Sequence, residues 1–433
     1  MVRSQRLRSL VRSTPLLLML GVGGVVTALG ISSPGLSLPS ASGGSIHDSP
    51  KEVIDQVWQI VYRDYLDSTG SYDERTWRQL RSNLLRKSYG GSAESYEAIR
   101  GMLASLDDPY TRFLDPKEFK EMQIDTSGEL MGVGIQLSLD KDTKELIVVS
   151  PIEGTPASRA GVQPKDVIVS IDGASTKGMT TEDAVKLIRG KVGTKVVLEL
   201  RRGAGEFVTV DLIRDRIELA AVDSSVNVAP NGTKVGYIRL KQFNANAAKD
   251  MREAINELNA DGAQGYVLDL RSNPGGLLMA SVDIARQWLD EGVIVSTKTR
   301  DGVKDIKRAS GRALTDKPVV VLVNEGSASA SEILSGAIQD NKRGTIVGMK
   351  TFGKGLIQSV RGLSDGSGMT VTIAKYMTPS GREIHKNGIK PDVVADITET
   401  QARQLKFEEL GTRSDPQYRV AETELSKLLR SAS

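Results

Sequence analysis

Cysteine is absent from this 433-residue sequence, and histidine occurs only at His47 and His385. Without cysteine the chain can form no disulfide, thiol nucleophile, iron–sulfur centre or Cys/His zinc site. We also expect the protein to hold no metal ion and no other cofactor. Aromatic residues are also scarce, with only six Phe, whereas 43 Gly indicate a chain with many turns.

A pronounced charge of either sign is missing as well, with 57 Lys and Arg against 54 Asp and Glu. Residues 1–41 contain four of the arginines and no acid, so the remainder of the chain is close to neutral. A neutral chain lacks the basic footprint of nucleic-acid-binding proteins, and we expect no nucleic-acid partner. The length itself predicts two or three domains with a sizeable core.

The first 41 residues have the pattern of an export signal. Four arginines precede an apolar run at 16–31, as in the positive and hydrophobic regions of a secretory signal. The run is somewhat long for a signal and short for a spanning helix, so an uncleaved anchor stays an alternative. We predict a signal peptide over 1–41 and a protein that works outside the cytoplasm.

Hydrophobic periodicity divides the rest of the chain into four regions. Residues 42–125 have helical spacing that starts at the capping pattern Ser49-Pro50-Lys51-Glu52; packing or dimerisation is their expected role. Short strand-like runs with two helical segments predict a small β-domain over 126–216. Alternating strand and helix patterns predict a layered α/β domain over 217–400, and 401–433 is expected to be a helical, peripheral tail. The predicted fold class is α/β within an overall α+β chain.

Two glycines stand at the start of a predicted strand, in the segment Gly132-Val133-Gly134-Ile135. Glycines so placed let several backbone N–H groups point to one spot and bind an anion. The anion could be the terminal carboxylate of a peptide that continues as an added strand beside the helix at 181–189. In isolation the pattern is more often an ordinary tight turn, but before this order of strands and helices it resembles a PDZ domain. We predict that these four residues bind the C-terminal ends of protein substrates.

A serine stands at a predicted strand-to-helix turn. The buried-strand run 318–324 is followed by small residues, then by Ser329, Ala330 and a helix that includes Glu332. Ser329-x-x-Glu332 forms a capping box, so a purely structural role stays open. The same position suits a nucleophile, because the positive helix end and the Ala330 N–H can stabilise an oxyanion. The two roles are compatible.

The base that would activate this serine is expected to be a lysine. His47 lies close to the processed N-terminus, and His385 lies in a polar turn where a surface position is favoured. Lys354 lies between glycines in the loop Thr351-Phe352-Gly353-Lys354-Gly355. A free lysine has a pKa near 10.4, so about one in a few thousand is neutral at pH 7. Burial would have to lower this pKa by several units; a solvated surface lysine is the alternative.

Three further positions could assist these two residues. The loop 271–276 follows a predicted strand and exposes backbone N–H groups at two glycines, although a simple turn is an equal alternative. Gln358 follows Lys354 by four residues, and on a strand the two would stand about 13 Å apart, so a supporting role requires a bend or a helical turn. Asp340 would lie roughly 16 Å from Ser329 along an unbroken helix. That separation favours anchoring of a helix end or loop over direct proton relay.

The order of these motifs carries a family resemblance. The leader, the helical segment, the loop at Gly132 and the motifs LRSNPGG, NEGSASASEI and TFGKGLIQ together resemble the C-terminal processing (tail-specific) serine peptidases. The resemblance implies a PDZ domain and a crotonase-like α/β peptidase core. It also implies site residues: Ser329 as nucleophile, Lys354 as general base, Gln358 as support for the lysine, the N–H groups of Gly275 and Ala330 as the oxyanion hole, and Asp340 in the catalytic set of some members. Asp107-Asp108-Pro109-Tyr110-Thr111 resembles a further family element, of unknown chemical role.

The leader, the short helical segment and the modest size most resemble the cyanobacterial and chloroplast branch of these peptidases. Members of that branch trim the C-terminal extension of the photosystem II reaction-centre precursor in the thylakoid lumen. The resemblance therefore implies a membrane-protein substrate with an accessible C-terminal tail. The alternatives are a periplasmic protease with other clients, a non-catalytic PDZ adaptor and a crotonase-like acyl-CoA enzyme.

Overall fold

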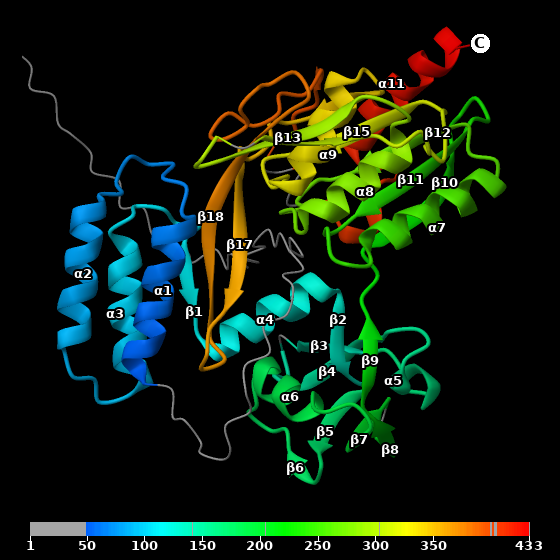
Figure 1. Cartoon of the computed structure of the whole chain (residues 1–433). Helices are drawn as coiled ribbons and strands as arrows, with labels where there is room; N and C mark the ends of the chain where they lie inside the picture. Colours follow the sequence, from blue (N-terminus) through cyan, green and yellow to red (C-terminus); the bar gives the residue numbers. More distant parts are fainter. Residues whose placement is uncertain are drawn as a thin grey trace, which may run out of the picture.

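Figure 1 shows a chain built from N-terminal helices, a small β-domain and an α/β core. The computed structural model describes residues 49–398, 401 and 405–432, with the exception of 141, 204 and 303. The predicted signal peptide over 1–41 lies outside these described residues, as does His47. Within them, no helix has the length and apolar character that crossing a bilayer requires.

The N-terminal part consists of three helices: α1 (Pro50–Asp64), α2 (Glu74–Arg86) and α3 (Ser92–Ala104). The Ser49 side chain caps α1 and Pro50 occupies its first turn, positions that these residues favour. Apolar residues recur three and four positions apart, so each helix has one apolar side. These sides pack together in a shared core that includes Trp58 and Trp77. Met369, from a strand late in the sequence, belongs to the same core. The helices therefore pack against the rest of their own chain.

The small β-domain contains a six-stranded antiparallel sheet: β3 (Ile135–Leu139), β4 (Leu146–Pro151), β5 (Val167–Ile171), β6 (Ala174–Ser175), β7 (Lys195–Arg202) and β8 (Glu206–Ile213). Two helices, α5 (Pro156–Arg159) and α6 (Thr181–Ile188), cover it. Strand β3 lies at the edge of the sheet, paired only with β4 among the described strands. This edge can accept an added peptide strand.

Helix α4 (Pro116–Ser127) and a two-stranded ribbon connect the β-domain to the other parts (Figure 1). The ribbon pairs β2 (Glu129–Gly132) with β9 (Asp215–Glu218). Asp115 caps α4 through a complete capping box with Glu118. Phe119 on α4 packs against Gly368, where an added Cβ would collide with the ring.

The α/β core is a six-stranded sheet whose strands lie side by side in the order in which they occur along the chain: β10 (Val222–Val228), β11 (Lys234–Leu240), β12 (Gly265–Asp269), β15 (Val319–Val323), β16 (Gly344–Gly348) and β19 (Val393–Val394). All neighbours are parallel except β10 and β11. The central strand β15 reads VVVLV, and all five residues are buried. A parallel strand covered on both faces requires such a continuous apolar run.

Helices cover both faces of this sheet. Helices α7 (Ala247–Ala260), α8 (Leu278–Trp288) and α9 (Ala330–Asp340) bury one face in a common core. The other face packs against α11 (Pro416–Ala432), which contributes Tyr418, with no exposed surface, to a separate core. The tail was expected to be peripheral, and this expectation is wrong. Its apolar residues complete the second face of the sheet, which no other described helix covers.

A second sheet joins the core to the N-terminal helices. It contains β13 (Val293–Thr299), β14 (Lys304–Arg308), β17 (Leu356–Gly362), β18 (Gly368–Met377) and the short β1 (Arg112–Leu114). Strand β1 pairs with β18, so the end of the N-terminal part becomes a strand of this sheet. Figure 1 shows β17 and β18 as a long hairpin that extends from the core toward α4.

Candidate active site

Three loops meet at one edge of the parallel sheet. Strands β12, β15 and β16 are neighbours in the sheet, and the loops 270–276, 324–329 and 349–355 follow their carboxyl ends. Because parallel strands end at the same edge, these three sequence motifs must lie close together. The topology thus assembles segments that the sequence separates.

Ser329 begins α9 in a backbone conformation that serine rarely adopts. Its φ is 58° and its ψ is −110°, which costs roughly 1–3 kcal/mol for a residue other than glycine. The side chain is fully buried, and its hydroxyl makes no hydrogen bond to a described residue. A strained turn that presents an unpartnered hydroxyl at a positive helix end is a site where a nucleophile can be stabilised.

The loop 270–276 packs directly against this serine. Gly275 has a φ of 104°, and an added Cβ there would lie 2.9 Å from the Cβ of Ser329 and 3.0 Å from the N of Ala330. The Ala328 N–H donates to the carbonyl of Asn273 at 3.0 Å. The Gly275 N–H donates to Asn273 Oδ1 at 2.9 Å. Gly275 and Ala330 therefore lie beside the serine, and the Gly275 N–H has an internal acceptor in this state.

Glu332 connects the serine to the lysine loop. Its carboxylate is fully buried; one oxygen accepts the N–H groups of Ser329 at 2.8 Å and Lys354 at 2.9 Å. The other oxygen accepts Thr351 Oγ1 at 2.5 Å and the Gly353 N–H at 2.7 Å. Burial raises the pKa of Glu332, and four donors compensate its desolvation. Since one oxygen bonds both backbones, the two loops are held side by side.

Replacing Glu332 by glutamine is expected to loosen this junction. The amide nitrogen would face two donors, so the free energy of unfolding should fall by about 1–3 kcal/mol. The value of kcat should fall as well, because the backbones of Ser329 and Lys354 lose their common acceptor. Urea unfolding and peptide cleavage measure the two effects. Glu325→Gln, an exposed substitution four residues before Ser329, is the matched control; an equal response of both variants would contradict the role of Glu332.

Lys354 is nearly buried in the loop after β16. Its exposed fraction is 8%, and burial lowers its pKa to about 8, with Arg112 adding repulsion while Asp108 and Glu332 act in the opposite direction. The amine lies over the ring of Tyr110, 4.8 Å from the ring centre. A substantial fraction of the lysine is therefore neutral at slightly alkaline pH, as a general base requires.

Tyr376 also joins the two residues. Its hydroxyl lies 3.0 Å from the carbonyl oxygen of Ser329 and within hydrogen-bonding distance of the carbonyl oxygen of Lys354. The Ser329 hydroxyl itself has no described partner, so its hydrogen bond to the Lys354 amine is not formed in this structure. Catalytic hydrogen bonds often tighten only when substrate binds.

Gln358 lies in β17, with its side chain buried. Its amide nitrogen is 3.4 Å from Thr372 Oγ1. Lys354 precedes β17 in a loop, and the pairing register shifts between Ile357 and Gln358. The backbone between the two residues is therefore not a regular strand, and the support of Lys354 by Gln358 stays a prediction.

Asp340 lies at the far end of α9 from Ser329. Its carboxylate accepts the N–H and hydroxyl of Ser380 at 3.0 and 2.7 Å and forms an ion pair with Arg382 at 2.5 Å. These contacts anchor the turn after β18 to the helix end. The geometry corresponds to the anchoring role that the helical distance favours.

The predicted carboxylate loop is fastened to the β-domain by its carbonyl groups. The carbonyls of Val133 and Gly134 accept the N–H groups of Ala157 at 2.9 Å and Ile152 at 2.8 Å. Val133 is buried in the core of the β-domain, and Gly134 has a φ of 78° with Thr155 filling the space a side chain would need. Gly132 ends β2 and Ile135 begins β3, the edge strand. Binding of substrate ends by this loop stays a prediction.

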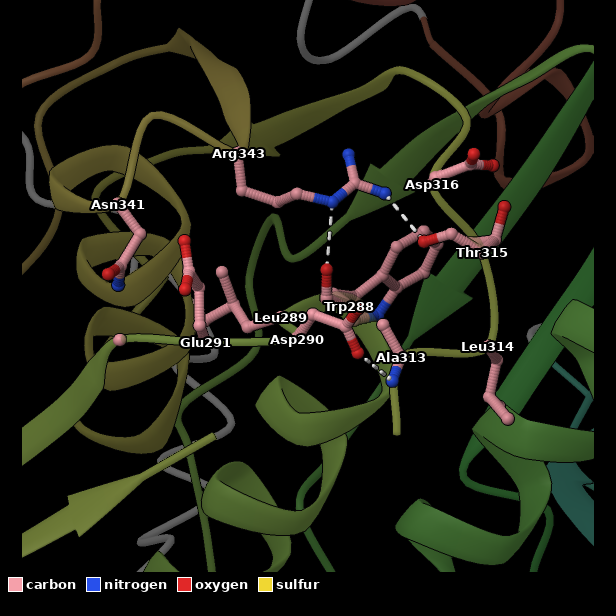
Figure 2. A pocket seen from close by; sticks show the side chains of 11 residues that line it. Trp288, Leu289, Asp290, Glu291, Ala313, Leu314, Thr315, Asp316, Asn341 and Arg343 are labelled. Carbon is pink, nitrogen blue, oxygen red and sulfur yellow. Dashed lines mark hydrogen bonds between the residues drawn. The ribbon is translucent and has the colours of Figure 1, made fainter. Parts of the chain in front are cut away.

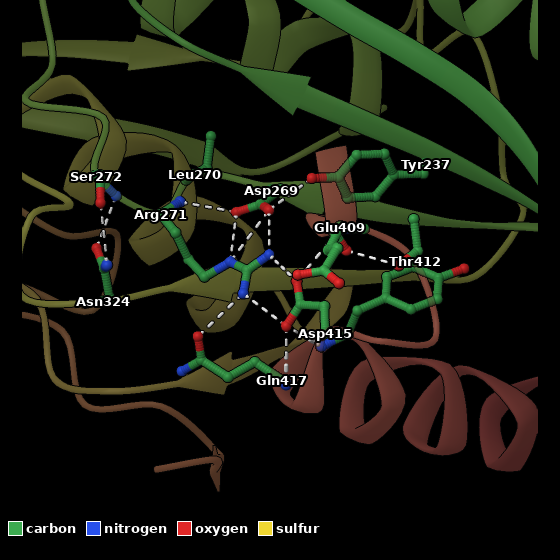
Figure 3. A network of polar contacts seen from close by, with 12 residues as sticks. Tyr237, Asp269, Leu270, Arg271, Ser272, Asn324, Glu409, Thr412, Asp415 and Gln417 are labelled. Atoms are coloured by element: carbon green, nitrogen blue, oxygen red, sulfur yellow. Dashed lines mark hydrogen bonds and ion pairs between the residues drawn. The ribbon is translucent and has the colours of Figure 1, made fainter. Parts of the chain in front are cut away.

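Sequence reasoning missed a buried ionic network behind the loop 270–276 (Figure 3). The Arg271 guanidinium contacts Asp269 and Asp415, each at 2.6 Å, and donates a hydrogen bond to Gln417 Oε1 at 3.0 Å. Asp269 in turn accepts the Tyr237 hydroxyl at 2.8 Å. Arg271 stands in the quoted motif LRSNPGG, but nothing in the sequence indicates that its partners include residues of the tail.

A separate hollow of about 720 Å³ lies at the other end of α9 (Figure 2). Arg343 lines it and donates to the carbonyls of Trp288 at 2.8 Å and Thr315 at 3.0 Å. None of the predicted site residues lines this hollow. Among the residues that the structure describes, no group of three or more Asp, Glu or His side chains is placed to hold a metal ion.

Comparisons with known proteins match both the β-domain and the α/β core of the chain. A profile of peptidase family S41 matches residues 234–395, and a PDZ-domain profile matches residues 147–202. The carboxyl-terminal-processing protease of Synechocystis sp. is 46% identical over 368 residues, covering 84% of each chain. The chloroplastic C-terminal processing peptidase of Tetradesmus obliquus is 41% identical, covering 79% of this chain and 76% of its own. These matches confirm the predicted PDZ domain and peptidase core.

Among solved structures, the photosystem II D1 C-terminal processing protease is similar to this chain. It is 40% identical, with a TM-score of 0.52, and the match covers 80% of this chain and 93% of that one. The similarity therefore extends over the helical part, the β-domain and the α/β core together.

Proposed function

Because the chain belongs to the carboxyl-terminal processing serine peptidases of family S41, we propose that Ser329 is its nucleophile and Lys354 its general base. One observation carries this assignment: a single buried Glu332 oxygen accepts the N–H groups of both residues. The Ser329 hydroxyl is unpartnered among the described residues, and burial lowers the pKa of Lys354 to about 8.

In the proposed reaction, neutral Lys354 takes the proton of the Ser329 hydroxyl as its oxygen bonds to the scissile carbonyl carbon. The carbonyl electron pair moves to oxygen, and the N–H groups of Ala330 and Gly275 stabilise the oxyanion. The Lys354 ammonium then protonates the leaving amine, and an acyl-enzyme remains. Lys354 next takes a proton from water as the water oxygen bonds to the acyl carbon. The bond between this carbon and the Ser329 oxygen then breaks, Lys354 returns the proton to that oxygen, and the shortened substrate is released. To donate to the oxyanion, the Gly275 N–H must break its hydrogen bond to Asn273 Oδ1 or donate to both oxygens at once.

The proposed substrates are proteins with accessible C-terminal tails. The edge of β3 and the loop Gly132–Ile135 would bind the terminal carboxylate and the residues before it. The similarity to the photosystem II D1 C-terminal processing protease supports the D1 precursor, a membrane protein, as the substrate. The chloroplastic relatives support a thylakoid-lumen location; a periplasmic location with other client proteins is the second candidate.

Peptides of identical sequence that end in either a free carboxylate or an amide test the proposal. We expect the purified protein to cleave the free-acid peptide at least tenfold faster, because the amide lacks the charge that the PDZ loop is proposed to bind. Mass spectrometry identifies the products and the scissile bond. Equal cleavage of both peptides would contradict tail recognition while leaving the peptidase chemistry intact.

A fluorophosphonate probe tests the nucleophile separately. The Ser329 oxygen should displace fluoride and form a phosphonate ester, so digestion should locate the label on the peptide that contains Ser329. Ser329→Ala is expected to prevent labelling. A non-catalytic PDZ adaptor or an acyl-CoA enzyme would bind tails or thioesters without this modification, so unlabelled protein would favour those alternatives.

A further inference from the structure

The segment 108–111, which comes from the N-terminal part of the chain, forms one wall of the lysine site. The Lys354 amine lies over the face of the Tyr110 ring, 4.8 Å from the ring centre. At this distance an ammonium is attracted by the negative face of an aromatic ring. The proposed mechanism makes no use of this ring.

Hydrogen bonds hold the segment on β18. The Asp108 carboxylate accepts the Tyr110 N–H at 2.9 Å and the hydroxyls of Thr111 at 2.8 Å and Thr372 at 2.7 Å. The Tyr110 carbonyl accepts Thr370 Oγ1 at 2.7 Å. The backbone that carries the ring is therefore fastened on both sides of Tyr110, and the ring position is defined by the sheet that also includes β17.

Charged groups also act on the Lys354 amine. Arg112 of β1 repels it, whereas Asp108 and Glu332 attract it. His385 contacts the Tyr110 ring edge-on, with 6.5 Å between ring centres, and burial lowers the pKa of this histidine. Tyr110 is thus placed between two titratable side chains and faces the amine directly.

We propose that Tyr110 is a positioning residue that holds the Lys354 amine and stabilises the ammonium formed when Lys354 accepts the Ser329 proton. The inference rests on the proposed role of Lys354 as the base. Burial favours the uncharged amine, whereas the ring face favours the ammonium. Tyr110 therefore keeps the amine basic enough to remove a proton within a site that otherwise suppresses its charge.

The test compares Tyr110→Leu with Tyr110→Phe by the rate of fluorophosphonate labelling from mildly acidic to alkaline pH. Leucine keeps an apolar wall but removes the ring, so the midpoint of the rising limb should shift to lower pH by roughly 0.5 to 1.5 units. The alkaline plateau should fall several-fold, because a less basic amine removes the proton more slowly. Phenylalanine restores the ring and should restore the midpoint. Tyr89→Leu, in the connection between α2 and α3, is the control for the same substitution elsewhere.

The direction of the shift separates positioning from a structural role. If leucine only admitted water, relief of desolvation would raise the lysine pKa and move the limb to higher pH. A raised or unchanged midpoint in Tyr110→Leu, or a phenylalanine variant that behaves like leucine, would overturn the inference. Failure of the proposed function is recognised independently, since the unmodified protein would then show no labelling at Ser329. Circular dichroism of each variant verifies that the fold is retained.

Discussion

Replacement of Lys354 by methionine is expected to lower kcat by a factor on the order of 10⁴ to 10⁶, the cost of removing a serine peptidase's base. Methionine has a similar length and suits a site with an exposed fraction of only 8%, so the fold should persist. The loss should appear in kcat and in probe labelling, because Ser329 keeps its place at the start of α9 but has no proton acceptor. Binding of tail peptides should be unchanged.

The cleavage rate of the unmodified protein should depend on pH in the way that a lysine base requires. Burial lowers the pKa of Lys354 to about 8, so about a tenth of the lysine is neutral at pH 7. The rate should rise about tenfold per unit below this pKa and level off above it, because only the neutral amine accepts the proton. A profile that is flat from mildly acidic to alkaline pH would remove Lys354 from the role of base. For the Lys354→Met variant, titration with a tail peptide measures whether substrate binding is unchanged, as expected.

Replacement of Arg271 by methionine is expected to lower the free energy of unfolding by about 3–5 kcal/mol. The substitution leaves two carboxylates, Asp269 and Asp415, buried without their cation; their exposed fractions are 1% and 0%. Arg271 holds the pKa of Asp415 below its usual range, so the loss should be largest near neutral pH and smaller in acid, where protonation of Asp415 removes its unpaired charge. The effect combines the desolvation of these charges with the loss of the contact between the core sheet and α11.

Urea unfolding followed by tryptophan fluorescence measures this effect, and Trp288 lies within the core that would be exposed. Arg252→Met, an exposed substitution on α7, is the matched control and should change the unfolding free energy by less than about 0.5 kcal/mol. Equal stability of the two variants would show that the Arg271 network contributes little. Peptidase activity should fall with Arg271→Met, because the loop that carries Gly275 follows directly.

Local patterns in the sequence were sufficient for much of the architecture. The apolar run of β15 predicts a strand buried on both faces, and the small residues before Glu332 predict a strand-to-helix turn at Ser329. Both patterns act over a few residues, through burial and capping. The prediction of a peripheral tail is wrong for the same reason. The charged residues of α11 are visible in its own short segment, whereas the sheet face that Tyr418 covers is formed by strands far away in the sequence.

The sequence by itself determined which chemistry was available, because a chain without cysteine and with two histidines leaves a serine and a lysine as the plausible reacting pair. Only the tertiary structure decided which groups surround that pair. Glu332 joins two loops because parallel strands end at one edge, and Tyr110 reaches Lys354 because β1 pairs with β18. Strand pairing brings together residues that lie hundreds of positions apart, and no periodicity along a single sequence records such contacts.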